Sequence, residues 1–186
     1  MMRLFFFLTA LAAMMLPFGC TTVQVSQDYD LQTDFSRYQD FQWAEKSREK
    51  TGDVRIDNPL LDARIRSAVE NTLKSKGFSE TPRDQADFLV NYQLAVRSRL
   101  ESDTYRTGVG YGYWPYWGGV GYETTVREYD EGILVIDFID AASGELFWRG
   151  IGTRRLRQYS DPQEITREVN ETVAKILAQF PPQPAK

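Results

Sequence analysis

The sequence predicts an α+β fold, a two-layer sandwich in which two helices pack on one face of a mostly antiparallel sheet. Two segments, residues 59–76 and 162–180, each carry a single apolar stripe at helical spacing. Five other segments alternate apolar and polar side chains, or are continuously apolar, as strands are. Because each helix has only one apolar stripe, two helices cannot cover both faces of a sheet, and the simplest packing puts both on the same face.

The first half of the chain beyond residue 21 predicts two strands and a helix. Residues 22–30 and 38–43 alternate in the manner of strands, and residues 44–56 are polar enough to form an exposed loop. Asn58 can accept hydrogen bonds from the first free N–H groups of a helix, and Pro59 suits the first helical position. We therefore expect the first helix to begin at this pair.

The second half predicts three strands and a closing helix. Residues 86–100 form a long amphipathic strand, and the continuously apolar residues 132–140 form a central one. Residues 141–144 have the composition of a hairpin turn, after which residues 145–158 return as the next strand. Ser160-Asp161-Pro162 is expected to open the last helix.

Size and composition fit one folded domain. The chain has 186 residues, of which 42% are hydrophobic and 26% charged, so it can bury a core of its own. We expect a signal peptide over residues 1–19, a single α+β domain over residues 20–182, and a short polar tail over residues 183–186.

The first twenty residues have the pattern of a bacterial lipoprotein signal. Arg3 precedes an apolar stretch, residues 4–16, that is shorter than the roughly 20 residues that a membrane-spanning helix needs. Gly19 then precedes Cys20, which is the only cysteine of the chain. This arrangement resembles the lipobox, in which the cysteine thiol is acylated and the peptide is cut directly before it.

The match to the lipobox departs at two positions, because Pro17 and Phe18 stand where the motif usually has leucine and a small residue. An ordinary secreted protein with a free thiol and an uncut membrane anchor are the alternatives. Two or three acyl chains on Cys20 would hold the domain stably at a membrane. Thr21 stands where inner-membrane lipoproteins commonly have aspartate. The resemblance therefore implies the outer membrane of a Gram-negative bacterium, on its periplasmic face.

Residues 104–122 are unusual, because they hold six of the 13 glycines, five of the ten tyrosines and two of the four tryptophans. Glycine bends freely and aromatic rings offer large amphipathic faces. Three interpretations remain open: a loop that packs on itself, a contact with a protein partner or membrane interface, and stacking on the sugar rings of a glycan. The candidate partner- or glycan-binding residues are Tyr111, Tyr113, Trp114, Tyr116 and Trp117.

The composition excludes several classes of chemistry. The chain has no histidine, which removes the usual general base and the commonest metal ligand, and its lone cysteine cannot form an internal disulfide. We predict no metal site and no cofactor. A net charge of −4 argues against nucleic acid, since phosphate binding needs clustered cations. The nearest cluster, Arg154, Arg155 and Arg157, is expected to split over the two faces of a solvated strand end.

A hydrolase built on two carboxylates needs no histidine and is the remaining enzyme class. Asp137 and Asp140 are the nearest pair, but strand alternation puts them on opposite faces. We expect Asp137 to be a hydrogen-bonded structural acid and Asp140 to be a turn residue. The sequence therefore predicts no catalytic residues and no enzyme.

A series of short pieces, spread in order over nearly the whole chain, resembles the bacterial lipoprotein family known as domain of unknown function 4136. The pieces are Asp28-Tyr29-Asp30, Asp34-Phe35-Ser36-Arg37-Tyr38, Phe41-Gln42-Trp43, Asn58-Pro59-Leu60, Ala86-Asp87-Phe88-Leu89-Val90, Gly132-Ile133-Leu134-Val135-Ile136-Asp137, Gly144-Glu145-Leu146-Phe147-Trp148-Arg149-Gly150, Lys175-Ile176-Leu177 and Phe180-Pro181-Pro182. The resemblance implies a lipid-anchored α+β domain of the cell envelope. It brings no established activity and no catalytic residues.

We therefore expect a non-catalytic envelope lipoprotein that serves as a binding or assembly module. Its expected partners are the membrane, through lipid on Cys20, and either an envelope protein or peptidoglycan. The alternative is a glycan-associated module or a hydrolase that uses carboxylates.

Overall fold

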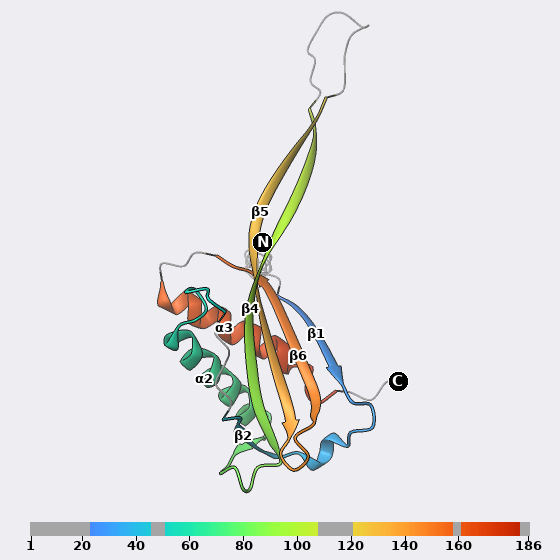
Figure 1. The fold of residues 1–186 in the computed structure, drawn as a ribbon, viewed down its shortest axis with the longest axis vertical. Coiled ribbons are helices and arrows are strands. Elements are labelled where there is room, and N and C mark those ends of the chain that lie inside the picture. Colours follow the sequence, from blue (N-terminus) through green and yellow to red (C-terminus); the bar gives the residue numbers. More distant parts are fainter. Residues whose placement is uncertain (1–22, 46–50, 108–120, 158–160, 183–186) are drawn as a thin grey trace, which may run out of the picture.

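The computed structural model describes residues 23–45, 51–107, 121–157 and 161–182, and within them it has an α+β fold. A six-stranded sheet and two helices account for most of this part of the chain (Figure 1). The strands are β1 (Gln24–Tyr29), β2 (Asp40–Trp43), β3 (Ser79–Glu80), β4 (Phe88–Thr107), β5 (Gly121–Asp140) and β6 (Leu146–Arg155). The helices are α2 (Pro59–Ser75) and α3 (Pro162–Leu177), and a short 3-10 turn spans Phe35–Arg37.

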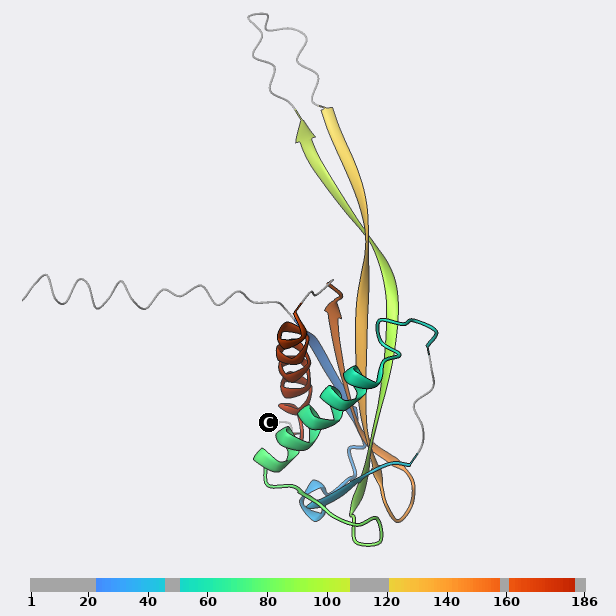
Figure 2. The ribbon, with the colours of Figure 1, turned by 90° about the vertical axis from the view of Figure 1, so that its left-hand side faces the viewer.

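The sheet is mostly antiparallel and has the strand order β1-β6-β5-β4-β2-β3. The parallel pairs are β2 with β4 and β2 with β3, at one edge of the sheet. β5 lies between β4 and β6, so the prediction of a central apolar strand is confirmed. Figure 2 shows α2 and α3 on the same side of the sheet. Neither helix is long and apolar enough to cross a membrane.

The helices begin where the sequence predicts. The Asn58 side chain accepts hydrogen bonds from the N–H groups of Leu60 and Leu61, and Pro59 is the first residue of α2. At α3, the Asp161 carboxylate accepts from the N–H of Gln163 in the same way. These caps satisfy N–H groups that have no partner inside the helix.

The core lies between the helices and the sheet and is rich in aromatic rings. Phe138 stacks on Trp148 with ring centroids 4.7 Å apart, and Tyr38 stacks on Phe147 at 4.0 Å. The side chains of Ile65, Val69 and Leu73 from α2 and of Val173, Ile176 and Leu177 from α3 complete it, and all are buried. Gly150 lets α3 approach closely, because a Cβ there would lie 2.5 Å from Ile176 Cγ2.

The long hairpin differs from the prediction. Residues 101–107 and 121–131 lie outside the strands that the sequence predicts, but they continue β4 and β5 in an unbroken register from Phe88–Asp140 to Thr107–Gly121. Cross-strand pairing supplies the hydrogen bonds that a loop would leave to water, and this outweighs the weak strand propensity of the charged residues. The strand prediction for residues 86–100 is thus right in kind but seven residues short at its C-terminal end.

Candidate functional site

β4 and β5 run far beyond the rest of the sheet and form a two-stranded arm. β6 pairs with β5 only between Glu131 and Ile139, so residues 98–107 and 121–130 have each other as their strand partners in the described chain. We call these residues the arm. Figures 1 and 2 show it projecting away from the helices. A two-stranded ribbon by itself is marginally stable in water, so an arm of this length is a structural anomaly.

One face of the arm and of its base is largely charged, and part of that charge is paired within the described chain. The same face also carries Tyr105, which is 54% exposed. Glu131 accepts from Arg97 at 2.8 Å and from Arg99 at 3.0 Å, and these hydrogen bonds hold its pKa below the usual value. Arg155 lies over the Tyr129 ring, 4.4 Å from its centroid, and pairs with Glu101 at 3.6 Å. This ladder of charges suits a face that remains in water.

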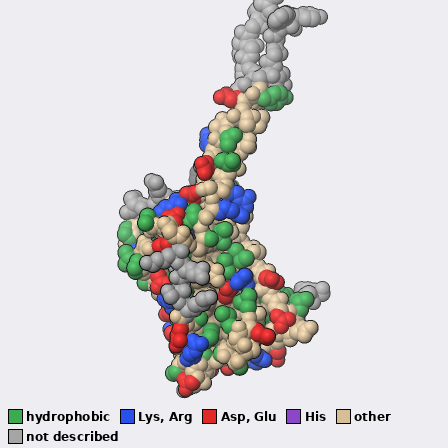
Figure 3. Space-filling view, viewed as in Figure 1, with side chains coloured by type: hydrophobic (Ala, Val, Ile, Leu, Met, Phe, Trp, Pro, Cys, Tyr) green, Lys and Arg blue, Asp and Glu red, His purple; other side chains and the backbone are tan. Residues whose placement is uncertain are grey.

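The opposite face of the arm carries exposed apolar side chains among polar and charged ones. Leu100 is 73% exposed, Tyr122 70% and Val126 59%, and the hydroxyls of Thr104 and Thr124 meet at 3.3 Å. We call this the apolar face, which comprises Leu100, Ser102, Thr104, Tyr122, Thr124 and Val126, and the strand register also places Ser98, Arg106, Glu128 and Asp130 on it. Figure 3 shows hydrophobic and charged side chains along the projecting part of the molecule. Leu100 and Val126 are diagonal neighbours on this face, because Leu100 pairs with Glu128 and Val126 with Ser102.

The apolar face continues the helix-covered face of the sheet. Side chains alternate along β4, so Leu100 is on the same side as Phe88, Val90 and Tyr92, which are buried in the core. The helices cover the sheet only near that core, and Figure 2 shows the arm extending past both of them. Apolar side chains of the arm therefore lie on the same side of the sheet as the core, but no helix of the described chain lies over them.

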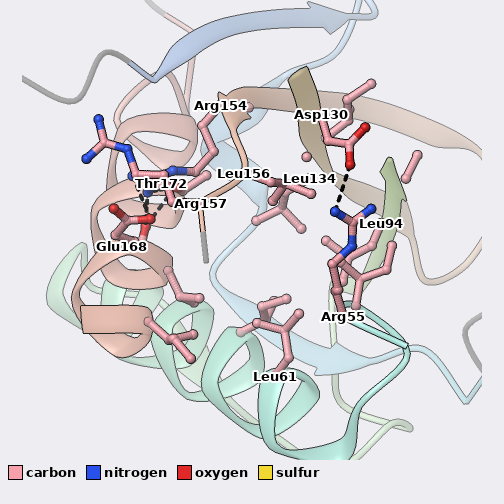
Figure 4. A pocket seen from close by; sticks show the side chains of 18 of the residues that line it. Arg55, Leu61, Leu94, Asp130, Leu134, Arg154, Leu156, Arg157, Glu168 and Thr172 are labelled. Atoms are coloured by element: carbon pink, nitrogen blue, oxygen red, sulfur yellow. Dashed lines mark hydrogen bonds and ion pairs between the residues drawn. The ribbon is translucent and has the colours of Figure 1, made fainter. Parts of the chain in front are cut away.

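A cavity of about 990 Å³ lies between the helices and the base of the arm (Figure 4). Its apolar lining includes Leu61 and Ile65 of α2, Leu94 of β4, Leu134 of β5, Leu156 beyond β6 and Val169 of α3. Two ion pairs flank this lining, Arg154 with Glu168 at 2.8 Å and Arg55 with Asp130 at 2.7 Å. The pKa of Asp130 is below its usual value, because Ser98 and Arg55 donate hydrogen bonds to it.

The arginine cluster at the end of β6 is split between the two faces, as predicted, but it is not all solvated. The Arg154 side chain is only 13% exposed and donates to Thr172 Oγ1 as well as pairing with Glu168. Arg155 points to the other face, toward Glu101. The solvated interpretation is therefore wrong for Arg154, because α3 packs over this strand end and supplies an acid to pair with it.

The two candidate carboxylates have structural partners. Asp137 is 3% exposed and accepts from Arg149 at 2.7 and 2.9 Å. The strand register places Asp137 beside Asn91 and Asp140 beside Phe88, on opposite faces. Asp137 and Asp140 therefore do not converge on one cleft. In the part of the chain that the structure describes, no group of three or more acids is placed to hold a metal ion.

Asp140 organises the β5–β6 turn. Its carboxylate accepts from the N–H groups of Ser143 and Ala142 at 2.8 and 3.0 Å, from the Tyr38 hydroxyl at 2.9 Å, and from Arg37. The Ser143 N–H, the Tyr38 hydroxyl and the other donors lower the pKa of Asp140 to about 2. Burial, with the hydrogen bond to Asp140, raises the pKa of Tyr38 to about 12. The predicted role of Asp140 as a turn residue agrees with this geometry.

The residues that the sequence singled out for binding lie outside the described part of the chain. These are Cys20 and the five aromatic residues Tyr111, Tyr113, Trp114, Tyr116 and Trp117. The apolar face of the arm was not among the sites predicted from the sequence. Leu100, Ser102 and Thr104 continue the alternation of β4, and Thr124 and Val126 continue that of β5, so a period-two pattern was present on both sides of the glycine-rich segment.

Several solved structures resemble the chain at low identity. A PDZ domain protein from Parabacteroides distasonis matches with 14% identity and a TM-score of 0.49, over 95% of this chain but only 40% of its own. The PelC dodecamer from Paraburkholderia phytofirmans matches with 17% identity and a TM-score of 0.49, over 84% of this chain and 95% of its own. A neuraminyllactose-binding hemagglutinin homolog from Helicobacter pylori matches with 13% identity and a TM-score of 0.42, over 81% and 87%.

All three TM-scores lie below 0.5, so we base no argument on these likenesses. No curated protein matches the sequence significantly. A family model does match, over residues 25–182, which includes every strand and helix except the first residue of β1. The chain therefore belongs to the family described as domain of unknown function DUF4136.

Proposed function

We propose that the protein is a non-catalytic envelope lipoprotein that binds a protein partner through the apolar face of its arm. The observation that carries the proposal is the exposure of Leu100, Tyr122 and Val126 on one face of the ribbon, where no helix lies over them in the described chain. Apolar rows of this kind gain stability when a partner removes them from water, by roughly 25 cal/mol per Å². The proposal also treats the domain as a two-layer sandwich, in which the helices leave the arm uncovered.

The chemistry of the two faces favours a protein partner. Several side chains of the charged face are held in ion pairs within the chain, whereas the apolar face offers threonine hydroxyls beside exposed apolar side chains. The unpaired outer edges of the arm also offer backbone donors and acceptors, which an extended segment of a partner can pair with. The aromatic residues between Thr107 and Gly121, Tyr111 to Trp117, would extend the same contact at the tip.

The expected anchor supports a partner near the same membrane. Gln24 of β1 pairs with Thr153, and Arg155, two residues further along β6, pairs with Glu131 at the base of the arm. The chain from Cys20 therefore enters the sheet at the end from which the arm projects. Lipid on Cys20 would hold that end toward the outer membrane, on its periplasmic face, where an assembly partner is within reach.

Site-specific photo-crosslinking in cells tests the proposal. A photo-reactive amino acid is introduced at position 100 or 126 on the apolar face, and at position 101 or 127 on the charged face as the matched control. The control positions are the next residues along the same strands, and Glu101 and Arg127 pair with each other across the arm. We expect a discrete adduct to one protein from positions 100 and 126 and a much weaker one from positions 101 and 127.

Adducts of equal strength from both faces, or adducts to phospholipid alone, would contradict a protein contact on the apolar face. Sedimentation with purified peptidoglycan distinguishes the glycan alternative. If Trp114→Ala and Trp117→Ala abolish co-sedimentation while the crosslinks at positions 100 and 126 are absent, the tip binds glycan and the partner proposal fails.

A further inference from the structure

The cavity at the base of the arm has the form of a site for an amphipathic small molecule. Its volume of about 990 Å³ is at the upper end of the roughly 300–1,000 Å³ that ligand pockets occupy. Figure 4 shows Leu61, Leu94, Leu134 and Leu156 around an open centre, with polar side chains set to either side. This continuous apolar lining can take an aliphatic chain, whereas the polar groups are confined to the rim.

The charges at the rim favour an anion. Four arginines and three carboxylates line the cavity, although the whole chain has a net charge of −4. Arg55 and Arg154 are compensated by Asp130 and Glu168. Arg64 donates a hydrogen bond to Thr166 Oγ1, and among the described residues neither Arg64 nor Arg157 forms an ion pair with a carboxylate. Glu128 is the third carboxylate of the lining, so the four arginines exceed the acids by one charge. The rim therefore offers two guanidinium groups that an acid of the ligand can pair with.

One residue of the lining also has a hydrogen-bond donor that lacks an acceptor. The Nε of Arg154 is buried and has no hydrogen-bond partner in the described part of the chain, although the other nitrogens of this guanidinium bond to Glu168 and Thr172. A buried N–H without an acceptor is costly, and a ligand oxygen would remove that cost if the Arg154 side chain turned its Nε toward the cavity.

From the apolar lining, the cationic rim and the unsatisfied donor, we propose that the cavity binds a single-chain aliphatic carboxylate, that is, a long-chain fatty acid. The hydrocarbon chain lies on the leucine lining, and the carboxylate pairs with the arginines of the rim. This inference does not depend on the partner contact of the arm, because the cavity is formed by the helices and the base of the sheet.

Displacement of a fluorescent fatty acid, dansyl-undecanoate, measures the binding. The protein is the mature chain from residue 20 to residue 186 carrying Cys20→Ser, so that neither the signal segment nor an acyl group of its own competes for the probe. We expect saturable one-to-one binding, and competition by octanoate, decanoate and dodecanoate that strengthens roughly fourfold per added methylene. Dodecanol, which has the same chain but no charge, should compete at least tenfold more weakly than dodecanoate.

Leu61→Glu tests the apolar lining, and Leu60→Glu is its matched control. Both positions are in the first turn of α2, where an acid suits the helix dipole, but Leu61 lines the cavity whereas Leu60 is exposed and does not. We expect Leu61→Glu to weaken dodecanoate binding at least tenfold and Leu60→Glu to leave it unchanged. Circular dichroism verifies that both variants keep their fold.

Arg64→Gln tests the cationic rim, with Arg167→Gln of α3 as the control outside the cavity. Arg64→Gln should weaken dodecanoate binding about three- to tenfold and leave dodecanol binding unchanged, and Arg167→Gln should change neither. The proposal is overturned if binding is not saturable, if affinity does not depend on chain length, or if dodecanol binds as well as dodecanoate. An equal loss in Leu60→Glu and Leu61→Glu would also overturn it.

Discussion

At the scale of single residues, two acids in one strand have different structural roles. Asp137 is held by the guanidinium of Arg149 on the neighbouring strand, and Asp140 by N–H groups of its own turn together with Arg37 and Tyr38. Each buried carboxylate has the donors that its charge requires. The geometry that fixes these acids also removes them from any shared reaction centre.

Asp140 makes the stability of the fold depend on pH in the acid range. Its pKa is lowered from 3.8 to about 2 in the folded chain, so the ionised form stabilises the fold at pH values above about 4. This contribution is lost as the pH falls through about 2. We expect Asp140→Asn to lower the free energy of unfolding by about 2 kcal/mol at pH 7, as measured by urea denaturation.

The difference between the wild type and Asp140→Asn should shrink toward zero as the pH is lowered from about 4 to 2, because the wild-type carboxyl then becomes neutral as well. Asp84→Asn, on an exposed loop, is the matched control and should change stability little at any pH. A constant difference between pH 2 and pH 7 would show that the charge of Asp140 does not stabilise the fold.

At the residue scale, the sequence predicted the features that depend only on neighbouring residues, such as where each helix begins. Asn58 and Asp161 cap their helices because their short polar side chains accept hydrogen bonds from free N–H groups of the first turn. The proline that follows each of them suits the first helical position. The burial of Arg154 could not be predicted in this way. Its ion pair with Glu168 depends on the position of α3 over the end of β6, which is a long-range property of the fold.

At the scale of elements, the arm combines regular pairing with little packing. Its strands keep an unbroken register from Ser98–Asp130 to Thr107–Gly121, but no helix lies over it in the described chain. Local stability depends on buried contacts as well as on hydrogen bonds, so the two halves of the same hairpin should differ in how easily they open.

Hydrogen exchange can measure that difference along single strands. We expect the hydrogen-bonded amides of residues 98–105 and 122–130 to be far less protected than those of residues 88–94 and 132–139, which face the helix layer or lie between two strands. Both segments of each strand have the same kind of ladder, so the inner segment is the internal control. Equal protection would mean that the arm is already stabilised within the monomer, and it would remove the main argument for a partner.

The sequence predicted the existence and type of the strands but not the length of the hairpin. Residues 123–131 have many charges, and charged segments between apolar ones usually form loops. Here the charges alternate with apolar and hydroxyl side chains, and Arg97, Arg99 and Glu131 meet only after the strands have paired. Pairing across a long hairpin is non-local, so one strand alone carries little of the signal.

At the scale of the whole molecule, the structure separates into a packed domain and a projecting arm. The core and the carboxylate contacts of Asp137 and Asp140 lie in the domain. The cavity extends to Ser98, Glu128, Tyr129 and Asp130 at the base of the arm, and the exposed apolar side chains lie further out along the arm. This division suggests that the two proposed binding activities can be removed independently of each other.

Shortening the arm tests this independence. If residues 101–127 are replaced by an Asn-Gly turn that joins Leu100 to Glu128, we expect the melting temperature to change by less than about 4 °C, because only exposed pairs such as Arg155–Glu101 are lost. Dansyl-undecanoate should bind within about threefold of its original affinity, while the photo-crosslinked partner should be lost. A large fall in melting temperature would show that the arm and the core unfold as one unit.

The sequence by itself determined the α+β class, the family, both helix starts and the structural character of the acids. Helical periodicity, helix capping and strand alternation are local signals, because each depends on residues within a short window of the sequence. Only the tertiary structure decided that β4 and β5 extend beyond the other strands of the sheet and that α3 packs over Arg154. It also decided that a cavity lined by Leu94 and Leu134 lies between the helices and the sheet. Each of these depends on where segments distant in sequence meet, and such contacts are set by the packing of the whole chain.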